Sequence, residues 1–272
     1  DGVLRIATTV DERWELPEDM RSESENIVTT LDADLDVLDQ ITGIAKTERI
    51  FSARYTDDRL YLVTFRQVDP FFVIDLSDPE DIDILGELKI TGFSRYLHPF
   101  GENTVIGLGR QATLEGRQQG VKISVFDVSD VSQPEEVASW KADERYGSSQ
   151  AEYDHHAFLL SKEKNLLVIP YSSYYWEDKD ESFNGVLVFH VEEYAVELRG
   201  EISHDPESRW RGQIDRSLWI EDLLYTKSYT QVQVHNLDNL RHVETVDLSL
   251  KEDRPVPIPY REDVAISGPA RG

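Results

Sequence analysis

The sequence predicts an all-β protein built from a repeated four-stranded unit, and three observations lead to that prediction. A phrase at residues 72–79 (FVIDLSDP) returns at residues 124–130 (SVFDVSD). Each copy ends in a tight acidic turn, and a second alternating apolar run leaves that turn. Weaker copies of the same arrangement recur roughly 45 to 60 residues apart along the chain. A fixed period of this length is typical of β-propellers, in which each repeat forms one blade.

The two strands that flank the acidic turn are expected five times. Their ranges are 27–31 and 35–41, 72–79 and 82–90, 124–130 and 135–140, 186–191 and 195–202, and 232–237 and 242–248. We expect Asp75 and Asp127 to cap the backbone of their own turns, as Asp and Ser side chains commonly do. The repeated phrase therefore predicts architecture and not a catalytic site.

Two more strand-like runs precede each copy after the first. They lie at 51–55 and 60–65, 96–98 and 105–108, 157–160 and 166–169, and 217–220 and 223–226. The runs are short, rich in Val, Ile, Tyr and Phe, and bounded by turn residues. Because four antiparallel strands make one propeller blade, we expect about five blades in a single domain at residues 1–250.

The first blade is expected to be incomplete. Leu4–Thr9 precedes its two flanking strands, and no run before it supplies an innermost strand. The Pro-rich tail at 251–272 contains Val264–Ser267, which can pair with Leu4–Thr9 and close a ring of five blades. The alternative is that the tail is disordered and the natural protein continues upstream. A three-stranded blade exposes the unpaired backbone groups of its edge strand. Either the tail strand or an upstream segment is therefore expected to pair with Leu4–Thr9.

The composition narrows the range of partners. A formal net charge of -25 argues against nucleic acid and anionic membrane surfaces, because both repel an acidic protein. Acidic residues are abundant and Arg is more frequent than Lys, a mixture that resembles halophilic proteins, whose self-repulsion is screened by salt. The alternative is an ordinary acidic surface. The absence of cysteine excludes disulfides, zinc–thiolate sites and thiol nucleophiles. No apolar run is long enough for direct membrane insertion, and the chain contains no signal peptide.

Several stretches resemble one family. They are residues 48–54, 62–70, 85–90, 96–99 and 153–158. Together they resemble the secreted β-propeller domain family of archaea and bacteria that is distantly related to WD40 repeats. The resemblance covers about residues 2–250 and implies an exported or cell-surface propeller, of which this chain is a C-terminal portion. The family supplies no activity that can be assigned to individual residues.

The expected connections are unequal on the two faces of the propeller. Those between the second and third strands of a blade, and several of those between blades, are long, and they emerge on one side, which we call the long-loop face. Long loops on a rigid scaffold often carry function, although drift of surface loops gives the same pattern. Tyr, Trp and Arg are enriched in recognition patches. The candidate binding residues are Trp14, Arg66, Gln67, Asp69, Arg110, Arg117, Tyr174, Tyr175, Trp176 and Trp210.

The inner strands of a propeller line a central channel. Corresponding positions there place Arg54, His98, Asp154, His156 and Arg216 at or near the channel. We expect Arg54 and Arg216 to pair with nearby carboxylates. In a strand, adjacent histidines point to opposite faces, so the sequence Asp154-His155-His156 predicts a structural histidine beside Asp154 and no metal site.

Recognisable catalytic motifs are absent from the sequence. Residues 32–36 resemble the opening of a calcium loop, but Val37 and Gly43 occupy the positions of its glycine and glutamate. Calcium in Asp-rich turns is the one cofactor left open. We expect a non-enzymatic binding or interaction scaffold with an unidentified protein or glycan partner and an undetermined oligomeric state. The alternatives are a glycoside hydrolase with two carboxylates across the channel and a structural component of a cell-envelope assembly.

Overall fold

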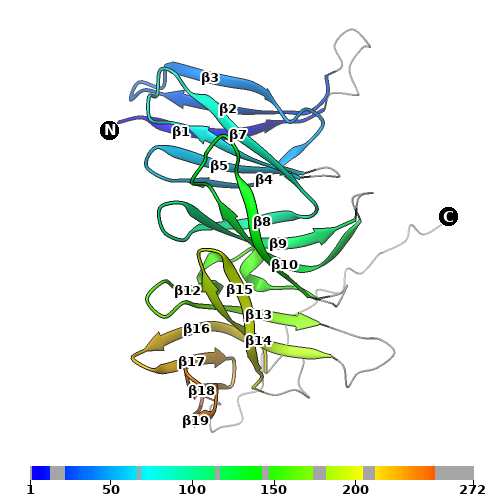
Figure 1. Ribbon diagram of the computed structural model, residues 1–272, viewed down its shortest axis with the longest axis vertical. Helices are drawn as coiled ribbons and strands as arrows, with labels where there is room; N and C mark the ends of the chain where they lie inside the picture. The colour runs from blue at the N-terminus through cyan, green and yellow to red at the C-terminus, as the bar shows by residue number, and fades with distance from the viewer. Residues whose placement is uncertain are drawn as a thin grey trace, which may run out of the picture.

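The protein folds into five antiparallel sheets that follow one another in chain order (Figure 1). The computed structural model describes residues 2–12, 22–65, 69–113, 117–142, 147–173, 182–204 and 212–248. Blade 1 contains β1 (Leu4–Val10), β2 (Glu25–Leu31) and β3 (Val37–Ile44). The other four blades each contain four sequential strands, as expected. The predicted all-β propeller of about five blades is therefore confirmed.

The complete blades differ in strand length, from three residues in β12 to ten in β10 and β14. Blade 2 contains β4 (Arg49–Tyr55), β5 (Arg59–Phe65), β6 (Asp69–Asp75) and β7 (Asp83–Ile90). Blade 3 contains β8 (Phe93–Pro99), β9 (Thr104–Ala112), β10 (Gln118–Asp127) and β11 (Glu135–Lys141). Blade 4 contains β12 (Leu159–Ser161), β13 (Leu166–Ser173), β14 (Phe183–Glu192) and β15 (Ala195–Ile202). Blade 5 contains β16 (Ile214–Ile220), β17 (Leu223–Ser228), β18 (Gln231–Asn236) and β19 (His242–Asp247).

The repeated phrase forms the third strand of a blade and the turn after it. The carboxylates of Asp75 and Asp127 accept hydrogen bonds from the N–H groups of Ser77 and Ser129 at 2.9 and 2.8 Å, which confirms the expected capping. In every blade the ladder between the third and fourth strands also shifts register just before this turn. Such bulges bend the strand and increase its twist, so the phrase carries a repeated structural device.

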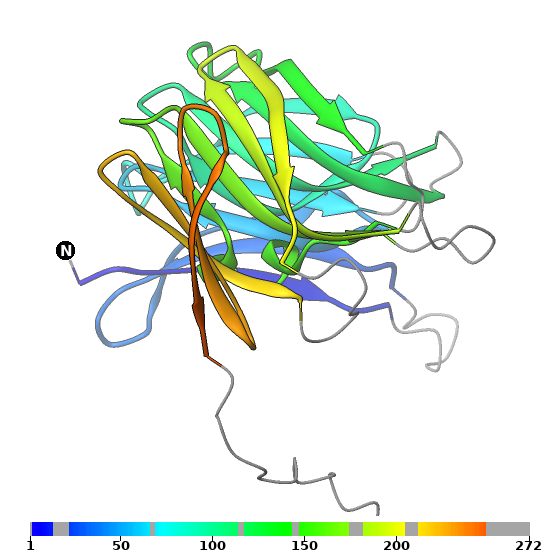
Figure 2. The same cartoon turned by 90° about the horizontal axis from the view of Figure 1, so that it is seen from below.

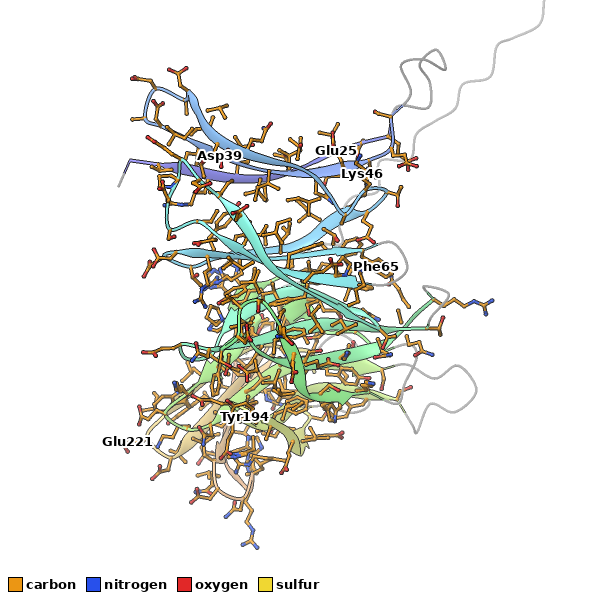
Figure 3. The ribbon with its side chains drawn as sticks, turned by 45° about the horizontal axis from the view of Figure 1, so that its top comes forward. Glu25, Asp39, Lys46, Phe65, Tyr194 and Glu221 are labelled. Atoms are coloured by element: carbon orange, nitrogen blue, oxygen red, sulfur yellow. The ribbon has the colours of Figure 1, made fainter. Side chains whose placement is uncertain are left out.

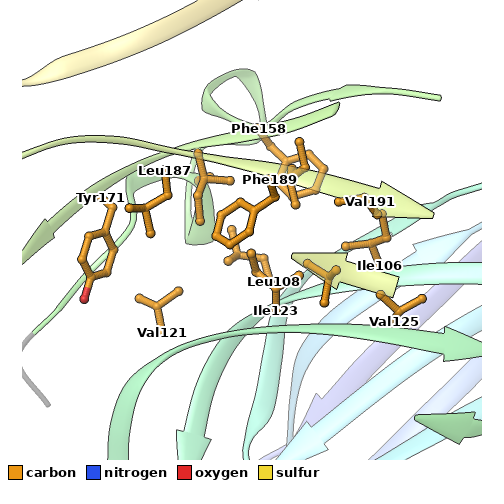
Figure 4. Close-up of a cluster of buried hydrophobic side chains, with 14 of the residues drawn as sticks. Ile106, Leu108, Val121, Ile123, Val125, Phe158, Tyr171, Leu187, Phe189 and Val191 are labelled. Atoms are coloured by element: carbon orange, nitrogen blue, oxygen red, sulfur yellow. The ribbon is translucent and has the colours of Figure 1, made fainter. Parts of the chain in front are cut away.

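The core lies between neighbouring blades. Each of the four hydrophobic clusters joins one blade to the next, from blades 1 and 2 to blades 4 and 5. In the cluster between blades 3 and 4, Ile123 from β10 and Phe189 from β14 are completely buried (Figure 4). Alternation along each strand sends successive side chains to opposite faces, so a middle blade contributes to two clusters.

Blades 1 and 5, at the two ends of the row, each have one face that no other described blade covers. None of the hydrophobic clusters of the described residues joins blade 1 to blade 5, and the ring of sheets is open. Figure 2 views the molecule from the blade 5 end, with β16–β19 in front. Among the described strands β1 pairs only with β2, so the expected shortage of one strand is confirmed. Val264–Ser267 lies outside the described residues.

The entry into blade 4 departs from the prediction. A strand was expected at 157–160, but β12 begins at Leu159. Before it come two short 3-10 helices, η2 (Gln150–Glu152) and η3 (His155–Ala157). No helix within the described ranges is long and apolar enough to span a membrane.

Candidate functional site at the channel mouth

Most of the predicted binding residues lie outside the described part of the chain. These are Trp14, Arg66, Gln67, Tyr174, Tyr175, Trp176 and Trp210. Asp69 opens β6, but its side chain is not described. Arg117 is exposed just before β10, and Arg110 lies near the end of β9. The part of the long-loop face that can be built from described residues is therefore the region around Arg110.

Two local hydrogen-bonding patterns shape the segment that enters blade 4. Ser149 and Glu152 form a capping box on η2, in which the Glu152 carboxylate accepts the Ser149 N–H at 3.1 Å. Asp154 caps η3 by accepting the N–H of His156 at 3.0 Å. These side-chain caps hold the backbone in helical turns directly before β12, and η3 includes Ala157, where the expected strand was to begin. The helix η2 packs against β8, β9 and β13, and η3 packs against β16. The segment thus spans blades 3, 4 and 5.

The expectation for the adjacent histidines was wrong. The rings of His155 and His156 lie side by side, with centroids 4.1 Å apart, because the pair belongs to a 3-10 helix and not to a strand. Both side chains are exposed, and Asp154 binds the backbone of His156 rather than its ring. Across the described ranges, no group of three or more His, Cys, Asp or Glu side chains is arranged to hold a metal ion.

A buried carboxylate fixes this segment to blade 3. The side chain of Glu152 is 0% exposed, and the Arg110 guanidinium donates to its two oxygens at 2.9 and 3.0 Å. Arg110 also donates to the Gly147 carbonyl at 2.8 Å. The Nε of Arg95 lies 3.4 Å from Glu152 without forming a hydrogen bond. The bidentate geometry restricts both the position and the orientation of Glu152.

A second ion pair fixes the segment to blade 5. Arg216 on β16 donates to the carboxylate of Asp154 at 2.8 Å, so the expected ion pair of Arg216 is present. Burial alone would raise the pKa of Asp154, but the His156 N–H and the Arg216 charge hold that pKa below its usual value. Asp154 is therefore ionised and satisfied at neutral pH.

Between these two anchors the chain displays three exposed side chains. Tyr153, which is 72% exposed, lies beside His155 and His156, and we call these three residues the ledge. The Arg95 guanidinium lies 5.1 Å from the centroid of the Tyr153 ring. Sequence reasoning missed Glu152, Tyr153 and Arg95. The Ser-x-x-Glu pattern of Ser149 and Glu152 was the signal available, since it marks a capping box.

Further along the channel wall lies a cluster from β4, β8 and the start of blade 4. The Tyr96 hydroxyl and the His98 Nδ1 are hydrogen bonded at 2.8 Å, and both rings pack against Phe158. Burial lowers the pKa of His98, and the positive charge of Arg54 lowers it further. The expectation that Arg54 pairs with a carboxylate was wrong for the described residues, because Arg54 faces these neutral rings and its buried Nε has no hydrogen-bond partner.

The described carboxylates of the channel mouth are poorly suited to acid–base chemistry. A glycosidase acid needs a raised pKa and a partner carboxylate across the cleft. The described carboxylates Glu152 and Asp154 instead each form an ion pair with an arginine, Arg110 and Arg216 respectively. What the arrangement offers is a rigid platform with exposed rings.

Comparisons with known proteins agree with this architecture. A family model described as "Beta propeller domain" matches residues 1–240. An uncharacterized protein of Methanocaldococcus jannaschii is 34% identical over 247 residues, which cover 91% of this chain and 35% of that protein. An uncharacterized protein of Archaeoglobus fulgidus is 40% identical over 220 residues, which cover 77% of this chain and 32% of that protein. The chain thus spans about a third of the length of these relatives.

Two solved structures match most of this chain with TM-scores below 0.5 and little sequence identity. Apo AztD from Citrobacter koseri matches with a TM-score of 0.49 and 11% identity, over 86% of this chain and 58% of that chain. The Cps50 (Swd1) β-propeller domain from Myceliophteria thermophila matches with a TM-score of 0.42 and 8% identity, over 82% of this chain and 69% of that chain.

Proposed function

We propose that this chain, which belongs to the β-propeller domain family, is a non-enzymatic binding module. Its partner is a protein or a glycan, and the ledge at the channel mouth is the part of the long-loop face that contacts it. The observation that carries the proposal is the anchoring of three exposed rings between two ion pairs, Arg110–Glu152 and Arg216–Asp154.

Rigid anchoring matters for binding because ordering a contact surface costs free energy. A side chain that is mobile in the free protein loses about 0.5–1.5 kcal/mol when a partner immobilises it. The backbone beneath the ledge is already fixed by the two caps and by ion pairs to blades 3 and 5. The cost of ordering the backbone is therefore met on folding, and only the rotamer freedom of the three side chains is lost when a partner covers them.

The residue types of the ledge also favour recognition. Tyrosine combines a large apolar ring with a hydroxyl, and it is enriched among residues that dominate binding energy. A tyrosine that is 72% exposed contributes little to the stability of the fold and gains most from being covered. Its position over Arg95 adds a cation beside the ring.

The proposed setting is extracellular or cell-surface, in a salt-rich environment. Support comes from the family resemblance and from the net charge of -25 with 53 acidic against 28 basic residues. At high ionic strength the Debye length falls to about 3 Å at 1 M, so self-repulsion of such a surface is screened.

The test compares the ledge with the opposite face. The triple variant Tyr153→Ala/His155→Ala/His156→Ala removes the three rings. The matched control is Tyr194→Ala, because Tyr194 is 61% exposed in the turn after β14, on the short-turn face (Figure 3). Each protein is immobilised and exposed to a cell-surface extract at high salt, and the retained components are quantified and identified.

We expect the native chain and Tyr194→Ala to retain the same components in equal amounts. The triple variant should retain at least tenfold less of them, since loss of one to two hot-spot residues costs about 1.4 kcal/mol or more. Equal retention by all three proteins would show that the ledge is not the binding surface.

A further inference from the structure

Arg95 has unused hydrogen-bonding capacity at the channel mouth. Its guanidinium contacts the rings of Phe51, Phe93 and Tyr153 at 5.4, 5.0 and 5.1 Å from their centroids. Its one ionic contact is Glu152 at 3.4 Å, and its Nε makes no hydrogen bond within the described part of the chain. A guanidinium has five donors in a planar fork that suits a carboxylate. Arg95 therefore has the charge and the donors to bind an oxyanion.

The hydrogen bonds that Glu152 accepts from other groups explain why Arg95 forms none with it. Arg110 takes both carboxylate oxygens of Glu152, and the Ser149 N–H adds a third hydrogen bond. One carboxylate thus faces two guanidiniums, which leaves an excess of one positive charge at this point. The Arg95 side chain is 23% exposed, so part of it is accessible to solvent.

Arg54 repeats this situation on the neighbouring channel strand. It lies on β4 next to Tyr96 and His98, both of which it influences electrostatically, and no carboxylate within the described ranges pairs with it. The two channel strands β4 and β8 pack against each other. Arg54 and Arg95 are thus two guanidiniums on neighbouring channel strands without a hydrogen-bonded carboxylate among the described residues.

The charge of the whole protein limits what the ligand can be. A polyanion is repelled by a surface with a net charge of -25, so the ligand carries one or two negative groups. The surroundings of Arg95 are three aromatic rings, while the nearby Gln150 amide already donates to Asp154 at 3.2 Å. Aromatic rings around a guanidinium suit a ligand that has apolar groups beside its carboxylate. A peptide places a carboxylate next to apolar side chains.

We propose that Arg95, supported by Arg54 further along the channel wall, binds a carboxylate of a peptide segment of the partner. The carboxylate is a chain terminus or an acidic side chain, and the exposed ring of Tyr153 covers the adjoining part of the segment. This inference rests on the proposed function, because it specifies the partner at the same channel mouth. The partner is a protein and not a glycan.

The experiment measures small carboxylates directly. The side-chain Nε–Hε signals of the arginines are followed by NMR during titration of the full chain at fixed ionic strength. The probes are N-acetyl-L-alanine for a chain terminus, N-acetyl-L-aspartic acid α-amide for an acidic side chain, N-acetyl-L-alaninamide as the neutral control, and glucuronate for a glycan. The variants are Arg95→Lys, Arg95→Gln and Arg54→Gln, with Arg199→Gln as the matched control, since Arg199 binds the carbonyl groups of Leu237 and Asp238 on blade 5.

We expect saturable shifts of the Arg95 signal with at least one of the two peptide carboxylates, and none with the alaninamide. Arg95→Gln should weaken binding at least tenfold, Arg54→Gln severalfold, and Arg199→Gln not at all. Arg95→Lys keeps the charge but loses the fork, so it should weaken binding while keeping the fold, which circular dichroism checks.

Equal shifts with the neutral amide, or unchanged binding in Arg95→Gln, would overturn the proposal. Tighter binding of glucuronate than of both peptide probes would overturn the choice of a protein partner. If the ledge variant loses its partner but no carboxylate shifts Arg95, the proposed function stands and this inference fails. If carboxylates bind but the ledge variant keeps its partner, the role of the ledge fails instead.

Discussion

The interface between blades 3 and 4 and the outer part of blade 5 are built from the same repeated unit, yet they are packed very differently. In β10 and β14 the apolar residues of the repeat are almost entirely buried, and they pack against each other. In β19 every residue is exposed, including Val243 and Val246. The repeat alone does not decide burial, because a strand becomes core only where a neighbouring blade covers it.

The register of blade 5 shows which face is uncovered. Leu224 faces blade 4, as does its cross-strand partner Trp219, and both contribute to the cluster between blades 4 and 5. Leu218 pairs with Tyr225 and Ile220 pairs with Leu223, and this second set lies on the opposite face. Leu218 and Ile220 are 50% and 55% exposed. Among the described residues, blade 5 thus shares a hydrophobic cluster with a neighbouring blade on one side only, while blades 2, 3 and 4 do so on both.

The largest expected effect comes from the middle of the molecule. Phe189→Ala removes a ring that is completely buried and packs against Trp140 with ring centroids 4.9 Å apart. Truncating a buried Phe typically costs about 3–5 kcal/mol of unfolding free energy. The control is Tyr229→Ala in blade 5. Because the Tyr229 side chain is 75% exposed, this substitution should change the unfolding free energy by less than about 0.5 kcal/mol. Urea unfolding at fixed salt measures both, and similar losses would contradict the comparison.

Acid should weaken blade 5 selectively. Burial lowers the pKa of His204 to about 4, with a contribution from His235. Burial lowers the pKa of His235 to about 4 as well, with a contribution from His242. The folded state keeps both rings neutral, whereas the unfolded chain binds protons below about pH 6.5. The unfolding free energy is therefore fully retained above pH 6.5 and falls as the pH drops from 6.5 toward 4. Between pH 7 and 5 the expected loss is about 2 kcal/mol per histidine.

Hydrogen exchange followed by mass spectrometry checks this expectation, after correction for the pH dependence of intrinsic exchange. The amides of β16–β19 should lose protection between pH 7 and 5, while those of blades 3 and 4 serve as the internal control. An equal loss of protection in all blades would mean that the acid sensitivity is global, arising from the net charge rather than from the two buried histidines.

A smaller effect is expected at the boundary between blades 3 and 4. Glu152→Gln removes a buried charge and leaves the guanidiniums of Arg110 and Arg95 without an anion. Because both are partly exposed, the cost should be about 2–3 kcal/mol, at or below the lower end of the range for a broken buried pair. Glu197→Gln, at an exposed position of β15, is the matched control and should be neutral. Thermal unfolding compares the two, and equal melting temperatures would show that the ion pairs do not hold the segment.

Local patterns in the sequence account for most of the fold that could be predicted. Strands such as β5 and β14 were visible because alternation and turn residues act over a few neighbours. The segment 154–158 was wrongly expected to be a strand for the same reason. His155 and His156 lie where a strand is expected by analogy with other blades, and only the caps at Ser149 and Asp154 redirect the backbone.

The candidate site depends on contacts that are distant in sequence. Arg110 meets Glu152 across 42 positions, and Arg216 meets Asp154 across 62. Arg216 was placed near the channel from its position in the repeat, whereas the role of Arg95 depends on which carboxylate oxygens Arg110 occupies. Such competition for one partner cannot be read from spacing, because it is settled only when three strands and a loop pack together.

The sequence by itself determined the blade, its repeat and the turn that ends its third strand, since those features need only short-range alternation and side-chain capping. The tertiary structure decided which copies of the repeat are buried and which guanidiniums have unused donors. The physical reason is that burial and ion pairing depend on the arrangement of neighbouring blades, and the open ring gives the same repeat two different environments.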